Sequence, residues 1–95
     1  MEFKLSDKKL KKILKLLPEG FSEVVESEDL EALKNRIKNI EQLSFETEIA
    51  MDADLSLNKA KQEVKGLAED YKATLHENAA MTSYILYVLS ERGES

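Results

Sequence analysis

The sequence predicts an all-α protein, a single domain over residues 1–95 in which two long helices form an antiparallel hairpin beside a short N-terminal helix. Three observations lead to this prediction. With 42% hydrophobic and 35% charged residues, the chain is too apolar to be disordered. Its three glycines and one proline are too few for the many turns of a β fold. Apolar residues also recur at the three- and four-residue spacing of amphipathic helices.

The first expected helix covers about residues 7–17. Ser6 is a suitable N-cap, and Pro18 followed by Gly20 ends the helix. The apolar face consists of Leu10, Ile13, Leu14 and Leu17. The other face carries the lysines Lys8, Lys9, Lys11, Lys12 and Lys15.

The segment 19–26 is ambiguous in the sequence. Phe21, Val24 and Val25 favour burial, but the segment is too short for periodicity to distinguish a helix from an extended strand. We expect it to be a connector that closes the core.

The second expected helix covers about residues 28–52. Ser27 is its predicted N-cap, and the acidic residues that follow suit the positive end of a helix dipole. The spacing of its seam predicts coiled-coil-like packing. The seam residues are Leu30, Leu33, Ile37, Ile40, Ser44, Thr47 and Met51, and Leu43, Phe45 and Ile49 broaden the seam. Polar seam residues such as Ser44, together with Asn78 in the next helix, are expected to fix the register of the hairpin.

The seam fails after Met51, because continuing its register would place Asp54 in the core. We therefore predict the turn of the hairpin at residues 52–56, where aspartate and serine side chains offer caps. The alternative is one continuous helical rod of about sixty residues, because no glycine or proline marks the turn.

The third expected helix covers about residues 56–92 and ends at Gly93. Paired from the predicted turn, it overhangs the second helix by roughly ten residues. The overhang is apolar nearly all round, which makes it a candidate interface for a homodimer. The candidate interface residues are Met81, Tyr84, Ile85, Tyr87, Val88 and Leu89.

The charge of the chain is unevenly distributed. The net charge of -5 combines a balance of +4 over residues 1–15 with one of -9 over the remainder. The basic N-terminal helix either pairs with an acidic surface of its own fold or orients the molecule on a partner. Because this helix is short and the rest of the chain is acidic, we expect no nucleic-acid partner.

Two groups of residues are candidate sites. The single histidine, His76, suits general base chemistry, but we expect it to be a solvated residue. A run without basic residues carries the carboxylates Glu41, Glu46, Glu48, Asp52 and Asp54, which suit Mg²⁺ or Ca²⁺ but equally a solvated acidic face. We expect no metal, no cofactor and no catalytic residue.

The composition also bears on location. The chain has no cysteine, its first residues form no apolar signal core, and no apolar run reaches the ~18 residues of a membrane span. We expect a cytoplasmic protein without a membrane span.

Several features lie between Leu33 and Gly93: an Ile-x-Asn-Ile-Glu helix at 37–41, an acidic turn near Asp52, a mid-helix Tyr71 and a terminal helix at 84–92. In these features the chain resembles small all-α proteins of unassigned function from tailed bacteriophages. The resemblance implies an accessory or host-interaction role, with a phage or host protein as partner, and it implies no site residues.

These observations favour a non-enzymatic protein-interaction module that self-associates through the end of its third helix. An alternative is an acidic inhibitor that imitates a nucleic acid and acts on a DNA- or RNA-handling protein. A further alternative is a small metal-dependent hydrolase that uses Glu48 and Asp52.

Overall fold

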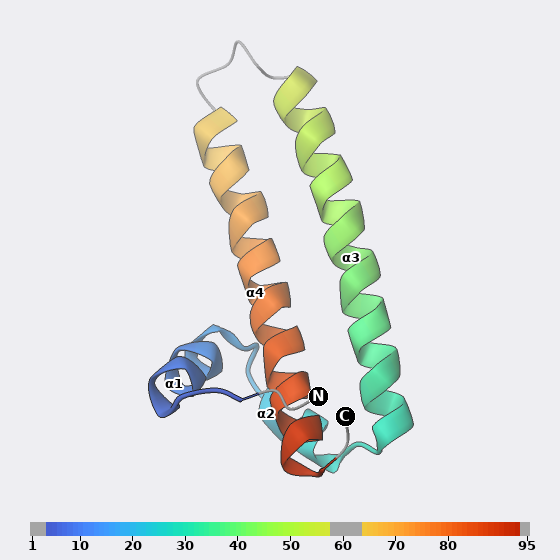
Figure 1. Ribbon diagram of the computed structural model, residues 1–95. Helices are drawn as coiled ribbons and strands as arrows, with labels where there is room; N and C mark the ends of the chain where they lie inside the picture. The colour runs from blue at the N-terminus through green and yellow to red at the C-terminus, as the bar shows by residue number, and fades with distance from the viewer. Residues whose placement is uncertain (1–3, 58–63, 94–95) are drawn as a thin grey trace.

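The computed structural model describes residues 4–57 and 64–93, and this part of the chain is all-α, as predicted. It contains four helices: α1 (Asp7–Leu16), α2 (Phe21–Ser27), α3 (Leu30–Leu57) and α4 (Val64–Glu91). Helices α3 and α4 lie side by side and antiparallel (Figure 1). Helices α1 and α2 pack against the C-terminal half of α4, so that three helices surround it.

Helix α1 begins where the sequence predicts. The Ser6 hydroxyl accepts a hydrogen bond from the Lys9 amide at 3.2 Å, which satisfies one of the free amides of the first turn. Its apolar face rests on the core of the protein, to which it contributes Leu10 and Ile13 together with Leu17 just beyond its end.

Residues 21–27 form the helix α2, where the sequence left a connector. Gly20 precedes it with φ of 80°, a conformation that a residue with a side chain rarely adopts. Val25 of α2 is fully buried, so this segment closes the core as expected, and it does so as a helix. The predicted N-cap at Ser27 is wrong, because Ser27 ends α2 and its hydroxyl donates to the Val24 carbonyl at 2.8 Å. Asp29 takes the capping role, since its carboxylate accepts from the Ala32 amide at 2.8 Å.

Arg92 fastens the end of α2 to the end of α4. Its guanidinium donates to the carbonyl oxygens of Glu28 at 2.7 Å and Glu26 at 2.8 Å. The last carbonyls of a helix have no partner within the helix and carry partial negative charge, so a cation with several donors suits them. The contact holds the turn between α2 and α3 against α4.

The predicted turn at residues 52–56 is wrong, because α3 continues through these residues to Leu57. Asp54 stays in the seam between the long helices, where the Tyr71 hydroxyl donates a hydrogen bond to its carboxylate. The sequence placed Asp54 in the turn because a carboxylate in the seam would be buried without a partner. The Tyr71 hydroxyl supplies that partner, so Asp54 can remain within α3. The connection between α3 and α4 lies outside the described residues.

The predicted overhang of α4 is also absent, because α3 and α4 have 28 residues each. The apolar end of α4 lies inside the single chain. Tyr84, Ile85, Val88 and Leu89 are buried there, and Met81 and Tyr87 pack against them partly buried. These residues were predicted to form a subunit interface, but the structure buries the first four in the core of the single chain.

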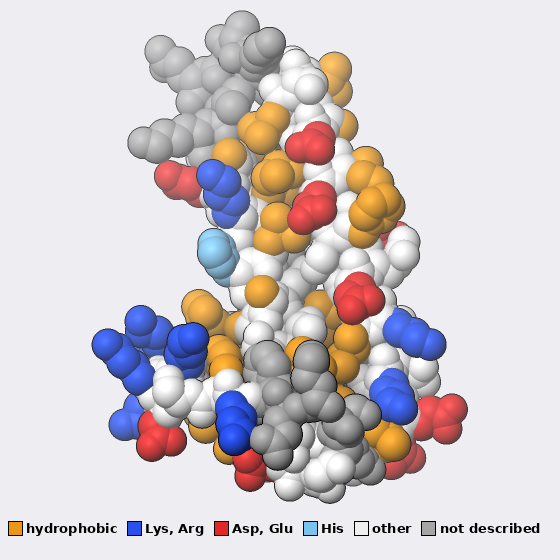
Figure 2. All heavy atoms as spheres, in the orientation of Figure 1, with side chains coloured by type: hydrophobic (Ala, Val, Ile, Leu, Met, Phe, Trp, Pro, Cys, Tyr) orange, Lys and Arg blue, Asp and Glu red, His pale blue; other side chains and the backbone are white. Residues whose placement is uncertain are grey.

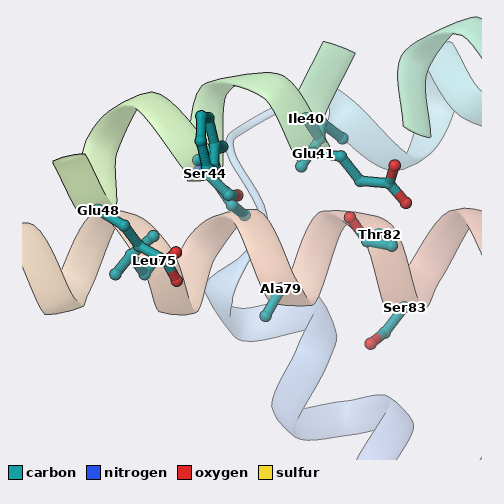
Figure 3. Close-up of a pocket in the computed structure, with 10 residues that line it drawn as sticks. Ile40, Glu41, Ser44, Glu48, Leu75, Ala79, Thr82 and Ser83 are labelled. Atoms are coloured by element: carbon teal, nitrogen blue, oxygen red, sulfur yellow. The ribbon is translucent and has the colours of Figure 1, made fainter. Parts of the chain in front are cut away.

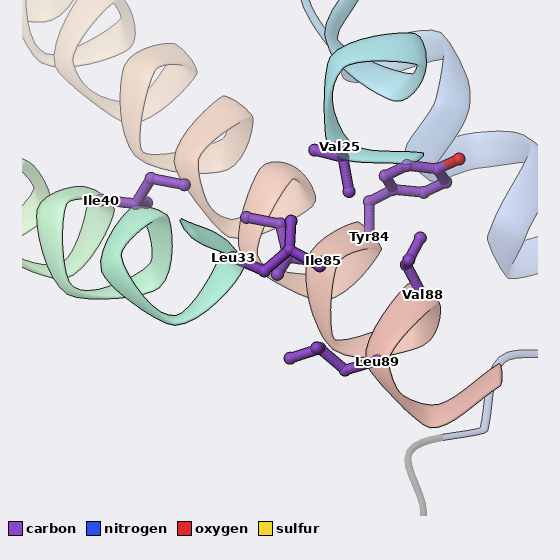
Figure 4. Close-up of a cluster of buried hydrophobic side chains, with 7 residues drawn as sticks. All are labelled: Val25, Leu33, Ile40, Tyr84, Ile85, Val88 and Leu89. Atoms are coloured by element: carbon purple, nitrogen blue, oxygen red, sulfur yellow. The ribbon is translucent and has the colours of Figure 1, made fainter. Parts of the chain in front are cut away.

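The core lies where all four helices meet (Figure 4). Its centre is formed by side chains from α2, α3 and α4 that exclude solvent almost completely. They are Val25, Leu33, Ile40, Tyr84, Ile85, Val88 and Leu89.

Tyr84 combines this burial with a polar contact. Its ring is 4% exposed, and its hydroxyl donates to the Glu26 carboxylate at 3.0 Å. Burial, then the hydrogen bond to Glu26, raise the pKa of Tyr84 to about 12, because both disfavour the phenolate. The phenol is therefore neutral in the folded protein well above its ordinary pKa of 10.0.

We expect Ile85→Val to lower the free energy of unfolding by about 0.5–1.5 kcal/mol, because Ile85 is 0% exposed and the lost methylene leaves a cavity. The same substitution at Ile49, which is 54% exposed, is the control and changes stability by less than about 0.5 kcal/mol. Urea unfolding measures both. The urea midpoint of either variant is expected not to depend on protein concentration. A concentration dependence that becomes stronger in Ile85→Val would instead indicate that Ile85 lies in a subunit interface.

We expect the native protein to lose stability as the pH rises from about 10 to about 12. In this window the unfolded chain releases the Tyr84 proton at its ordinary pKa of 10.0 while the folded chain holds it, so unfolding becomes easier. Below pH 10 this residue contributes no slope. Urea unfolding across the window should show a shallower fall for Tyr84→Phe than for Tyr87→Phe, which keeps Tyr84. Equal slopes in the two variants would contradict the assignment.

Candidate functional site

The hairpin extends well beyond the core. Ile40 of α3 and Asn78 of α4 are the last buried residues in the direction of the connection between the long helices. Beyond them lie residues 41–57 and 66–77, here called the distal arm, and none of the side chains described in it is buried. Figure 1 shows that α1 and α2 lie at the opposite end of the hairpin. The distal arm is thus a two-helix structure without a covering layer.

A groove runs between α3 and α4 at the base of the distal arm (Figure 3). Its volume is about 510 Å³, and it is lined from both helices. The lining residues from α3 are Ile40, Glu41, Ser44, Phe45 and Glu48. Those from α4 are Leu75, Asn78, Ala79, Thr82 and Ser83.

Apolar side chains lie exposed along this groove. Phe45 is 58% exposed at its edge, and Ile49 continues the same face of α3 one turn further. Leu75 lines the opposite wall half-buried. Figure 2 shows hydrophobic side chains gathered between and beside the two long helices on this face, with acidic side chains among them.

The charges around the groove are almost all negative. Residues 41–57 of α3 carry five carboxylates and no basic residue, and residues 66–77 of α4 carry three carboxylates and a single lysine, Lys72. Glu41 and Glu48 line the groove itself, and Asp52 continues their row by one turn. An apolar groove thus has an acidic rim on its α3 side.

Asn78 is the buried polar residue of the described core, with 6% exposure. Its Nδ2 donates to the Ser44 hydroxyl at 3.1 Å, which links α4 to α3 across the seam. This link agrees with the register role predicted for the two residues. Among the described residues no group donates to Asn78 Oδ1, so a buried acceptor at the floor of the groove has no donor there.

The other residues weighed from the sequence do not converge. His76 is exposed on α4, outside the groove lining. Within residues 4–57 and 64–93, no three acidic or histidine side chains come close enough together to hold a metal ion. Glu48 and Asp52 lie along the rim as exposed neighbours on one helix face.

The lysines of α1 remain exposed at the other end of the molecule (Figure 2). No ion pair joins Lys8, Lys9, Lys11, Lys12 or Lys15 to a carboxylate of the described chain. The alternative in which this helix pairs with an acidic surface of its own fold therefore has no ion pair of these lysines to support it among the described residues. An ion pair between Arg36 and Glu28 lies elsewhere, at the base of α3.

The groove itself was not predicted from the sequence. Phe45 and Ile49 were assigned to a broadened seam, but both are more than half exposed. The signal that identifies them is their position in α3 relative to the true seam, since Ile40 and Ser44 face α4 and Phe45 lies to one side.

None of the helices in the described part of the chain has both the length and the apolar character of a membrane span.

We expect Ser44→Ala to lower the free energy of unfolding by about 1–3 kcal/mol, because it leaves the buried Asn78 amide without an acceptor. Adding Asn78→Leu removes that buried polar group and should recover most of the loss. Ser83→Ala is the control, since its hydroxyl lines the same groove without a hydrogen bond to a described residue. Urea unfolding of the native chain, Ser44→Ala, Asn78→Leu and the double variant measures the coupling, with Ser83→Ala measured beside them. A loss in the double variant equal to the sum of the two single losses would show that the two residues are not coupled.

Comparison of the chain with models of protein families, with curated proteins and with solved structures finds no match. The resemblance to small phage proteins therefore stays a prediction.

Proposed function

We propose that this chain is a non-enzymatic protein-interaction module that binds its partner through the groove of the distal arm. The observation that carries the proposal is the bare distal arm, where residues 41–57 and 66–77 contain no buried side chain among those described. Amphipathic helices gain stability by burying their apolar faces against another element. Within residues 4–57 and 64–93, Phe45 and Ile49 have no such element and remain more than half exposed, which favours their contact with a partner.

The proposal moves the binding surface away from the segment that the sequence suggested. Self-association through Tyr84 to Leu89 would require the core to open, because Ile85 is fully buried and Val88 and Leu89 nearly so. The partner proposed is therefore another protein that meets the groove. The cysteine-free composition favours a reducing cytoplasm as the place where this happens, and the phage resemblance favours a phage or host protein.

A second candidate function is an acidic inhibitor that occupies the nucleic-acid site of a DNA- or RNA-handling protein. The charge of the distal arm favours it, with eight carboxylates and one lysine over the two described ranges. This function predicts that the partner binds duplex DNA or RNA and that the chain competes for that site. A partner without nucleic-acid binding would contradict this second candidate and leave the first unaffected.

The proposed function is tested by site-specific photo-crosslinking in cells that naturally make the protein. With a photoreactive phenylalanine at position 45, we expect a discrete adduct with one partner protein, because this side chain lies at the groove. Position 43 is the matched control, since Leu43 is similarly exposed on α3 but does not line the groove. The absence of an adduct at position 45, or an equal adduct at both positions, would contradict the proposal.

A further inference from the structure

We propose that the occupant of the groove is a basic amphipathic helix of a partner protein, which completes a three-helix bundle along the distal arm. The inference rests on the proposed function and names the chemistry of the partner. It follows from the shape of the groove, from its charges and from the unpaired acceptor at its floor.

The shape of the groove suits a helix. It lies between two antiparallel helices, and a third helix packs into such a space by placing its own ridge of side chains between theirs. On the α4 side the wall is formed by the small side chains of Ala79 and Ser83, one turn apart, which permit close approach. The groove follows residues 40–48 of α3, which extend about 13 Å at about 1.5 Å per residue, so a helix of about 18 residues covers it with roughly one turn to spare at each end.

The charges of the groove select a basic helix and assign its orientation about its own axis. Glu41 and Glu48 line the α3 side and Asp52 continues their row one turn further, whereas the α4 side of the groove offers the neutral Ala79, Thr82 and Ser83. Lysine or arginine is therefore favoured on the flank of the occupant that faces α3. The apolar stripe of the occupant then lies over Phe45 and Leu75.

The floor of the groove adds a position of polar specificity. Asn78 Oδ1 is buried without a donor among the described residues, and a partner donor placed opposite it would satisfy an acceptor that is otherwise costly. A single polar residue in an apolar seam fixes the register of packed helices. The occupant is therefore expected to carry one hydrogen-bond donor, such as glutamine, within its apolar stripe.

A second copy of the chain fits this site poorly. Pairing two distal arms through the groove would bring the carboxylates of one α3 toward those of the other, and like charges at an interface oppose association. Nucleic acid fits less well still, because its phosphates would meet Glu41 and Glu48. A basic helix carries the opposite charge to Glu41 and Glu48, so it is attracted to the groove and not repelled.

The test uses the full chain and three fluorescent 18-residue helical peptides, observed by anisotropy at physiological salt. The first peptide has leucine at i, i+3, i+4 and i+7 spacing and lysine elsewhere, the second has glutamate in place of lysine, and the third has the lysine pattern with one central leucine changed to glutamine. We expect the lysine peptide to bind, the glutamate peptide not to bind, and the glutamine variant to bind at least as tightly as the lysine peptide.

Variants of the chain locate the binding. Glu48→Lys is expected to weaken the lysine peptide at least tenfold, whereas Glu46→Lys, with the same charge change outside the groove lining, changes binding less than threefold. Phe45→Ser is likewise expected to weaken binding at least tenfold, and Leu43→Ser is its control. Equal effects of Glu48→Lys and Glu46→Lys would show attraction to net charge alone and overturn the inference.

Two further outcomes separate this inference from the proposed function. A crosslinked adduct at position 45 together with no binding of the lysine peptide would leave the interaction module standing and overturn the basic helix. Peptide binding with the stated pattern of variants but no adduct in cells would support the chemistry of the groove and overturn the proposed function. A dimer at high micromolar concentration that Phe45→Ser dissociates would identify a second copy as the occupant and overturn the inference.

Discussion

The C-terminal half of α4 is apolar on nearly every side, and the rest of the fold follows from the need to cover it. One neighbouring helix can shield only one face of another, so α3, α1 and α2 each take a side. Helix α2, although only seven residues long, is held in place because Val25 enters this core and Arg92 binds the carbonyls at its end. The short elements near the N-terminus exist in their observed form because α4 requires them.

The same constraint divides the hairpin into two parts with different properties. Near α1 and α2, the seam between α3 and α4 belongs to a core that contains Leu33 and Ile85, both fully buried. Beyond Ile40 and Asn78 it depends on half-buried contacts and on the hydrogen bond from Tyr71 to Asp54, which raises the pKa of Tyr71. Local opening in such proteins follows the density of buried contacts. The groove therefore lies at the boundary between a rigid base and a more loosely held arm.

The helical periodicity of the sequence was sufficient to predict the all-α class, the first helix with its Ser6 cap and the pairing of the two long helices. The turn was misplaced because a carboxylate at a seam position was taken to indicate the end of the helix. Only the structure reveals that Tyr71 lies opposite Asp54 and donates a hydrogen bond to it. That error shortened one helix and created an apparent overhang, which turned core residues such as Ile85 into interface residues. The groove was not predicted because the exposure of Phe45 depends on the lack of a covering helix beside it. The periodicity of apolar residues does not indicate which helices cover which face.

The separation of the core from the distal arm bears on how this protein can change over evolution. Substitutions at positions such as Phe45 or Glu48 alter the groove but remove no buried contact, so their cost to folding is small. Under the proposed function, selection on partner choice and selection on fold stability therefore act on different residues of the same two helices. A lineage carrying this scaffold can exchange one partner for another through surface mutations alone, without first accumulating stabilising changes elsewhere.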